Sequence, residues 1–283
     1  MNALPRRLLG STRVALSALT FGSMRMLPAR LSVAEGVALL SRLMDGGLDS
    51  LHVSSEYESF GYFSEIFHAL RAERDVRGLR FVAKVGSPHF GEDRFEDRQF
   101  ETGIDFYLDA LGIETVDVAQ WLLRFDLRQP EARERIFERD AERVSACVDR
   151  LRRAGKIQAM VSFPYSEGIA LRALALPACD GLALYVNPFE RELAPLLDRA
   201  HLAGKSVIAI RPLAAGRVAG DAPEDVALIR DAGGGDMTCV AGRVRAAFQY
   251  ALVHPAVVTV VASLNSIAQA ETALNAIGAP ESR

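Results

Sequence analysis

A tyrosine and a lysine in neighbouring segments are the residues whose types and spacing could perform acid catalysis. Tyr57 follows the segment 47–56, and Lys84 closes the apolar segment 80–84. An ammonium next to a phenol stabilises the phenolate, so it lowers the pKa of the phenol. Such a phenol can protonate the oxygen of a carbonyl while hydride arrives at its carbon. The pair therefore predicts a proton-donating site.

Lys84 is stronger evidence for such a site than Tyr57. A lysine that ends a buried apolar strand is costly unless another group receives its charge. His52, near the end of the preceding strand, is a third candidate for the site. A cationic His52 would depress the pKa of Lys84, whereas a neutral ring could accept a hydrogen bond from Lys84 or Tyr57. The sequence leaves both states open.

The elements that position these residues follow from hydrophobic patterning. Short apolar segments alternate with longer segments of helical period, as in parallel sheets covered by helices. The expected strands are 19–22, 50–53, 80–84, 115–122, 157–162, 181–186, 206–211 and 257–262. The expected helices are 33–45, 62–74, 97–111, 132–154, 167–174, 192–203, 240–254 and 267–277. This alternation predicts an α/β protein with a single (β/α)8 TIM barrel over residues 1–283, and a doubly wound open sheet is the alternative.

A barrel would bring the candidate residues together. The carboxyl ends of its strands form one rim, and active sites of this architecture lie there. His52, Tyr57, Lys84 and Ser162 all fall near that rim. Residues 6–16 are expected to form a small cap under the barrel. Residues 213–238 are expected to form a long loop on the active-site side.

Composition excludes several classes of protein. The chain has 283 residues, of which 49% are hydrophobic, and a formal net charge of −3. A nucleic-acid partner would need a clustered basic excess, and a membrane span would need about 18 consecutive apolar residues. The three cysteines are far apart and have no metal-ligand spacing. We therefore expect a cytoplasmic protein with no signal peptide, no metal, no nucleic-acid or membrane partner, and a small-molecule substrate. The oligomeric state is not readable.

Segments along nearly the whole chain resemble the aldo-keto reductase family, in the family's order. They are 20–24, 45–57, 64–74, 111–118, 153–162, 187–189 and 211–216. The resemblance implies reduction of a carbonyl with NADP or NAD as cofactor, with Tyr57 as the acid and Lys84 as the residue that tunes it. The residues that it implies for cofactor binding are Gly22, Ser23, Met24, Ser162, Arg211, Pro212, Leu213, Gly216 and Arg217.

The resemblance is incomplete at the residues that would carry the chemistry. The position of the family's aspartate is His52, and that of its histidine is Leu122 or Leu123, depending on the register. The positions that would hold the nicotinamide ring are apolar: Phe163, Ala183 and Ile210. The last strand is followed by neither Pro-Gly nor the basic residues that would hold the 2′-phosphate of NADP. The sequence thus predicts a divergent active site with an apolar pocket.

Other polar residues near the rim could replace the missing groups: Glu56, His89, Arg124 and Asp126. The leading interpretation is an NAD(P)H-dependent oxidoreductase that reduces a small carbonyl substrate. One alternative is a redox-inactive barrel, a pseudoenzyme, that binds a metabolite or a partner. Another is a cofactor-free proton-transfer enzyme that uses His52, Tyr57 and Lys84.

Overall fold

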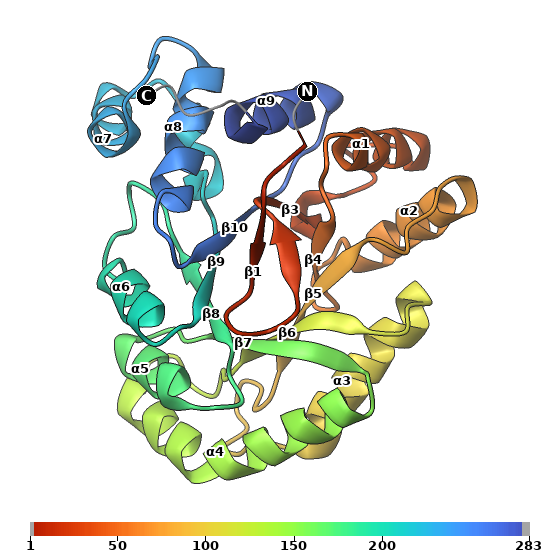
Figure 1. The fold of residues 1–283 in the computed structure, drawn as a ribbon, viewed down its shortest axis with the longest axis vertical. Coiled ribbons are helices and arrows are strands. Elements are labelled where there is room, and N and C mark those ends of the chain that lie inside the picture. The colour runs from red at the N-terminus through yellow and green to blue at the C-terminus, as the bar shows by residue number, and fades with distance from the viewer. Residues whose placement is uncertain (1–2, 279–283) are drawn as a thin grey trace.

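Parallel strands close into a barrel surrounded by helices in the computed structural model, which describes residues 3–278 (Figure 1). Around the ring, the strands follow the order β10-β3-β4-β5-β6-β7-β8-β9. All neighbouring pairs are parallel. The expected (β/α)8 TIM barrel is confirmed, and the open sheet is not formed. The outer limits of the predicted domain, 1–283, include terminal residues outside the described part and stay a prediction.

The strands and helices agree closely with their expected positions. The barrel strands are β3 Leu19–Gly22, β4 Ser50–Ser54, β5 Arg80–Gly86, β6 Val116–Leu122, β7 Ile157–Phe163, β8 Gly181–Tyr185, β9 Ser206–Ile210 and β10 Val257–Ala262. The helices are α1 Val33–Asp45, α2 Phe60–Glu73, α3 Asp97–Leu111, α4 Pro130–Arg153, α5 Glu167–Ala175, α6 Pro195–Leu202, α7 Pro223–Gly233, α8 Val240–Leu252 and α9 Ile267–Gly278. Short 3-10 turns follow two of the strands: η1 Ser23–Arg25 and η2 Ala214–Ala219.

Strand alternation divides the buried side chains into two layers. The larger cluster lies between the strands and the helices and includes Phe81, Trp121 and Leu123. The smaller cluster fills the barrel interior and includes Val82 and Leu122. Because side chains alternate along a strand, the residues two positions beyond an inward side chain also point inward. This places Lys84 and Gln120, which are partners in the β5–β6 register, in the interior above Val82 and Val118.

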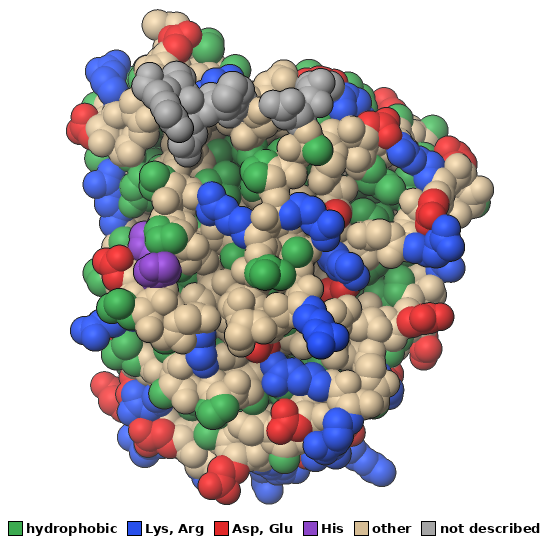
Figure 2. Space-filling model, viewed as in Figure 1, with side chains coloured by type: hydrophobic (Ala, Val, Ile, Leu, Met, Phe, Trp, Pro, Cys, Tyr) green, Lys and Arg blue, Asp and Glu red, His purple; other side chains and the backbone are tan. Residues whose placement is uncertain are grey.

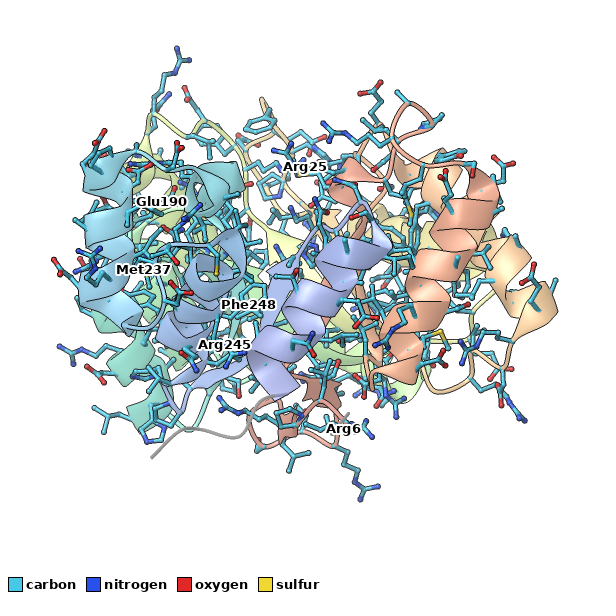
Figure 3. The ribbon with its side chains drawn as sticks, turned by 90° about the horizontal axis from the view of Figure 1, so that it is seen from above. Arg6, Arg25, Glu190, Met237, Arg245 and Phe248 are labelled. Atoms are coloured by element: carbon cyan, nitrogen blue, oxygen red, sulfur yellow. The ribbon has the colours of Figure 1, made fainter. Side chains whose placement is uncertain are left out.

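An antiparallel hairpin closes the amino-terminal end of the barrel. Its strands are β1 Arg6–Leu8 and β2 Ala15–Ser17. Leu9, Val14 and Leu16 are at most 2% exposed and belong to the interior cluster. In the side view, Arg6 lies at the hairpin end, whereas Arg25 and Glu190 lie toward the opposite end (Figure 3). The expected cap is confirmed, and it leaves the carboxyl-terminal rim as the end available for a site.

The expected long loop at 213–238 is wrong, because the segment contains η2 and α7. Pro223 occupies the first turn of α7, where its missing N–H costs no hydrogen bond, and Glu224 and Asp225 complement the helix dipole there. The helix ends at the glycine run, in which Gly234 and Gly235 have φ of 65° and 93°. The glycines dominated the sequence pattern and concealed a short helix with little periodicity.

The outer surface gives limited information about partners. Figure 2 shows the hairpin face, where basic and acidic side chains are interspersed, so this face carries no uniform charge. Every helix among residues 3–278 is too short or too polar to cross a bilayer. The expected cytoplasmic location and the absence of a nucleic-acid partner stay predictions.

We expect Leu16→Ala to lower the free energy of unfolding by about 2–5 kcal/mol, because it opens a cavity under the barrel. Leu16 is fully buried, whereas Leu8 of the same hairpin is 59% exposed. Leu8→Ala is therefore the matched control and should change stability by less than about 0.5 kcal/mol. Chemical denaturation would measure both. Equal effects of the two substitutions would mean that Leu16 does not pack into the amino-terminal end of the barrel.

Candidate active site

Backbone strain gathers at the carboxyl-terminal rim. Among residues 3–278, five non-glycine residues have positive φ: Phe125, Tyr165, Arg211, Ala214 and Ala215. All of them lie within a few residues after the ends of β6, β7 and β9. Such conformations cost about 1–3 kcal/mol each and persist where the surrounding structure enforces them, often at functional sites. The strain therefore points to the same rim as the candidate catalytic residues.

Tyr57 and Lys84 meet at this rim. Tyr57 lies in the turn between β4 and α2, and the Lys84 ammonium lies 4.9 Å from the centre of the Tyr57 ring. The turn is held by Tyr107, whose hydroxyl accepts from the Ser55 N–H at 2.7 Å and donates to the carbonyl oxygen of Lys84 at 2.7 Å. One tyrosine of α3 thereby joins the segments that carry Tyr57 and Lys84. The structure brings the predicted pair together, and the catalytic roles of the two residues stay predictions.

The expected lowering of the Tyr57 pKa is wrong for this arrangement. The pKa of Tyr57 is raised, first by burial and then by the nearby groups Tyr107, Glu56 and Tyr185. Lys84 is not among the main causes, because its own pKa of about 8 means that it has lost its charge before Tyr57 ionises. The Tyr57 phenol is consequently protonated at neutral pH.

Lys84 has a lowered affinity for its proton. Burial, followed by the positive charge of Arg124, lowers its pKa to about 8, and Glu56 acts in the opposite direction. Lys84 is therefore a cation at neutral pH that can lose its proton at a modest cost. Because an unfolded lysine titrates near 10.5, this group makes the fold more stable as the pH rises from about 8 to 10.5.

His52 is neutral and has a partner that the sequence did not reveal. Burial, followed by the charge of Lys84, lowers the pKa of His52 to about 3, so the cationic alternative is wrong. Its Nε2 lies 2.8 Å from Oε1 of Gln120, so neither Lys84 nor Tyr57 is its hydrogen-bond partner. Gln120 is fully buried, and its Nε2 has no partner among the described residues. An amide in the apolar segment 116–122 was the signal that could have identified it.

A cluster of polar and charged side chains lies next to Tyr57 on the outer side of the rim. The Glu56 carboxylate pairs with Nη2 of Arg124, and its Oε1 lies 3.4 Å from Nε2 of His89. Nη1 of Arg124 approaches Nδ1 of His89 at 3.5 Å. All three residues were recognised in the sequence as polar replacements, and the structure joins them. Asp126, the fourth, instead pairs with the exposed Arg128.

Gly22, Ser23 and Met24 continue from β3 into η1. A Cβ at Gly22 would lie 3.1 Å from the Ser263 Oγ, so the absence of a side chain lets β3 approach the end of β10 closely. Ser23 is fully buried, and its Oγ has no partner among the described residues. Met24 is 51% exposed. The Ser23 hydroxyl is thus an unpartnered polar group among the described residues at the end of β3.

The segment after β9 carries the other predicted cofactor residues. Arg211 lies over the Tyr185 ring at 4.8 Å and pairs with Glu190. Arg217 lies over the Phe189 ring and pairs with Asp225. The residues between them that were also predicted are Pro212, Leu213 and Gly216. Gly216 has a φ of 106°, which only glycine adopts without strain. Both arginines are accessible, and both already have carboxylate partners.

The positions expected to hold the nicotinamide ring face an apolar interior. Of the two leucines, Leu122 belongs to the interior cluster and Leu123 to the outer one; which of them occupies the position of the family's histidine stays a prediction. Phe163, Ala183 and Ile210 also belong to the interior cluster. Ser162 is opposite Trp121 in the β6–β7 register and points toward the helices, so the structure does not bring its hydroxyl to the other predicted residues. None of these positions therefore offers a side-chain amide to a carboxamide; the amide in the interior is Gln120.

We expect the Lys84 side chain to titrate with a midpoint near pH 8, as a cation below this pH and a neutral amine above it. The chain's other lysines, Lys156 and Lys205, provide internal references in NMR spectra of protein with 13C-labelled lysine. The Lys84→Met variant assigns the signal. A midpoint above 10 would show that the ammonium is not destabilised by its surroundings.

We expect His52→Asp to raise the pKa of Lys84, because it places an anion beside a buried ammonium. The control is His52→Asn, because asparagine has nearly the same shape as aspartate but carries no charge. This variant should leave the Lys84 titration close to that of the unsubstituted protein. The same NMR experiment measures both variants. Equal shifts in the two variants would attribute the change to lost volume or to the lost His52–Gln120 bond.

Comparison with known proteins supports the fold strongly. The sequence matches no protein-family model and no curated protein. The structure is similar to an aldo-keto reductase from Bacillus halodurans in its holo form, with a TM-score of 0.79, 17% identity, and coverage of 98% of this chain and 92% of the other. It is also similar to a thermostable aldo-keto reductase in complex with the inhibitor epalrestat, with a TM-score of 0.76, 17% identity, and coverage of 99% and 96%.

A third similar structure is an aldo-keto reductase from Klebsiella pneumoniae in complex with NADP and acetate. Its TM-score is 0.70 at 19% identity, and the match covers 97% of this chain and 90% of the other. At such low identities, structural similarity establishes the fold and leaves the activity open. The predicted resemblance is thereby confirmed at the level of the fold: the chain has the barrel architecture of aldo-keto reductases.

Proposed function

We propose that this chain is a divergent member of the aldo-keto reductase family that reduces a small carbonyl compound with NADPH or NADH. Tyr57 would be the acid, and Lys84 would tune it. The observation that carries the proposal is the contact of the Lys84 ammonium with the Tyr57 ring, 4.9 Å from the ring centre, at the rim of the barrel. Two residues from successive strand-to-helix segments meet where barrel enzymes carry their chemistry.

Tyr57 holds its proton at neutral pH, so it would donate this proton only to an oxygen that gains charge. The raised pKa of Tyr57 keeps its proton in place until the carbonyl oxygen becomes basic. Arg124, which acts to lower the pKa of Tyr57, would stabilise negative charge at this point. Lys84, with a pKa of about 8, lies close enough to return a proton to the site. His52 would contribute as a neutral ring that holds Gln120 beside Lys84.

The described residues fit the phosphate groups of a nicotinamide cofactor better than its nicotinamide ring. Gly22, Ser23 and Met24, together with the segment from Arg211 to Arg217, would hold its phosphates through backbone amides, a free hydroxyl and guanidinium groups. When bound, the cofactor supplies the hydride. Ser162 stays a candidate ligand by resemblance only, because its side chain points away from the interior. Discrimination between NADP and NAD is open.

The apolar interior favours one alternative, a redox-inactive barrel that binds a metabolite or a partner. Phe163, Ala183 and Ile210 replace the groups that would orient a nicotinamide ring. The cofactor-free proton-transfer reading has less support, because a neutral His52 with a pKa of about 3 is a weak base at neutral pH.

We expect NADPH or NADH to bind in the micromolar range, measured by calorimetry. Fluorescence is the weaker method, because Trp121, the chain's one tryptophan, packs in the outer layer against Phe95 and Phe137. No heat of binding at millimolar cofactor would sink the reductase proposal and favour the redox-inactive barrel.

In a screen of carbonyl compounds, Tyr57→Phe should lower kcat/KM by at least about 100-fold, because it removes the proton donor and keeps the ring. Tyr250→Phe removes a phenol on α8, outside the rim, and should retain full activity. A fully active Tyr57→Phe variant would exclude Tyr57 as the acid. Cofactor affinity should remain unchanged in both variants.

A further inference from the structure

We propose that Arg124 binds the carboxylate of an oxo acid, so that the site takes a small anionic carbonyl compound. This inference rests on the proposed reductase function and names its substrate class. It is carried by an unbalanced group of cations around Tyr57 and by a guanidinium that already holds a carboxylate from the surface.

Positive charge exceeds negative charge on this side of the rim. The cationic groups are Lys84, Arg124 and Arg133. Glu56 pairs with Arg124 and acts on Lys84, whereas Glu134 acts on Arg133 but pairs with Arg172. Within residues 3–278, neither Lys84 nor Arg133 takes part in an ion pair. The chain as a whole has a net charge of −3, so this excess is local. A cluster of one sign in a low-dielectric site attracts ligands of the other sign.

Arg133 supplies a buried charge without a counterion. It is 1% exposed, and its Nη2 donates to the carbonyl oxygens of Leu123 and Pro164, both at 3.1 Å. Its guanidinium lies 4.9 Å from the centre of the Tyr165 ring, and its Nε has no partner among the described residues. Removing a cation from water without an anion is costly, so an incoming anion would relieve this cost.

Arg124 is the group that can touch a ligand. It follows β6, its side chain is 11% exposed, and its charge influences both Tyr57 and Lys84. The phenol of Tyr165 is a further partner of its guanidinium. A guanidinium presents a planar set of donors that matches a carboxylate. A carbonyl oxygen at Tyr57 would thus leave the other end of a small molecule near Arg124.

The contact with Glu56 indicates which kind of ligand Arg124 can bind. Its carboxylate pairs with Nη2 of Arg124 and lies near His89, yet its side chain is 36% exposed and belongs to the turn that carries Tyr57. A partly exposed carboxylate can turn to solvent at little cost. The carboxylate of a substrate would take its place and make the same charge-assisted hydrogen bonds.

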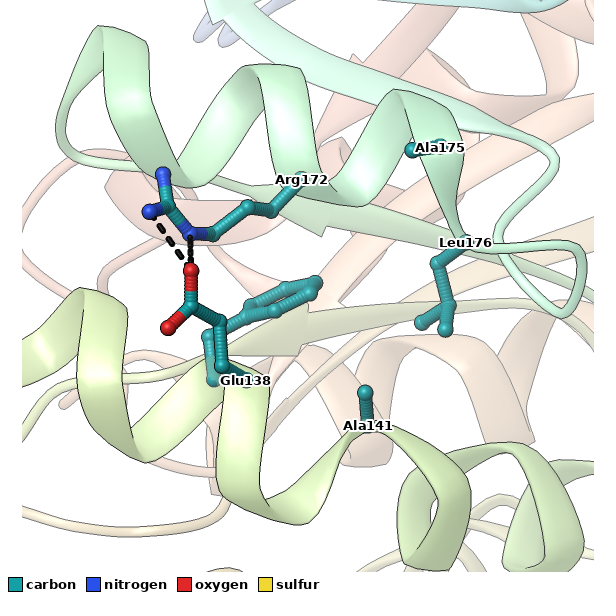
Figure 4. A pocket seen from close by; sticks show the side chains of 6 residues that line it. Glu138, Ala141, Arg172, Ala175 and Leu176 are labelled. Carbon is teal, nitrogen blue, oxygen red and sulfur yellow. Dashed lines mark hydrogen bonds and ion pairs between the residues drawn. The ribbon is translucent and has the colours of Figure 1, made fainter.

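A hollow away from the rim lacks these properties. A cavity of about 290 Å³ between α4 and α5 is lined by Phe137, Glu138, Ala141, Arg172, Ala175 and Leu176 (Figure 4). Arg172 is paired with Glu134 and Glu138, so its charge is balanced. That hollow contains no cation in need of an anion, which sets the rim group apart.

Calorimetry with butyrate and butyramide tests the anion site without cofactor or turnover. Butyrate should bind at least about tenfold more tightly than butyramide, which is of similar size and uncharged. Arg124→Gln should weaken butyrate binding by about tenfold to a hundredfold, the effect expected for hydrogen bonds to a charged group. Arg128→Gln, which changes an arginine with a 90% exposed side chain on the same segment, should have no effect. Glu56→Gln should strengthen butyrate binding because it removes the competing carboxylate.

Equal affinity for the two compounds, or unchanged butyrate binding in Arg124→Gln, would overturn the inference. A second measurement separates it from the proposed function. 4-Oxobutanoate and butanal have the same chain length and differ in one carboxylate. In Arg124→Gln, kcat/KM for 4-oxobutanoate should fall at least about tenfold further than kcat/KM for butanal, which reports the loss of the Arg124 charge beside Tyr57 for a substrate without a carboxylate. Reduction of both compounds without this split would retain the reductase and remove the anion site. Butyrate binding in a protein that binds no cofactor would retain the anion site and remove the reductase.

Discussion

The burial of the Lys84 ammonium is the constraint on which the rest of the candidate site depends. Lys84 points into the barrel because β5 alternates; below it lies an apolar cluster, and its neighbours include the buried polar residues His52, Ser54 and Gln120. A charge in such a place needs compensation. The π-face of Tyr57 and the distant carboxylate of Glu56 provide part of it. The low pKa of Lys84 reflects the part of the desolvation cost that these groups do not offset.

The same shortage of anions explains the character of the rim. The position where the sequence resemblance implies an aspartate holds His52, and this ring stays neutral because burial and Lys84 oppose its protonation. Arg124 adds further positive charge, and Glu56 answers it from the surface side. A site with neutral interior partners and cationic borders is suited to a ligand that brings its own negative charge.

The sequence predicted the barrel well because local patterns dictate it. The segments 19–22 and 257–262 matched β3 and β10 to the residue, and helix ends at glycines such as Gly112 were correctly placed. Tyr57 and Lys84 were paired correctly because parallel strands must bring their carboxyl ends to one rim. The helix at Pro223–Gly233 was missed because its hydrophobic periodicity is weak and its neighbours are glycine-rich.

Residue order and alternation by themselves determined the fold, the hairpin under the barrel and the rim that carries the candidate residues. Only the tertiary structure decided the ionisation of the site, because desolvation and charge act through space. It raised the pKa of Tyr57, kept His52 neutral, assigned Gln120 as the partner of His52 and turned Leu122 inward. These outcomes depend on neighbours 30 to 130 positions away along the chain, such as Tyr107 and Tyr185 around Tyr57, which no local pattern reveals.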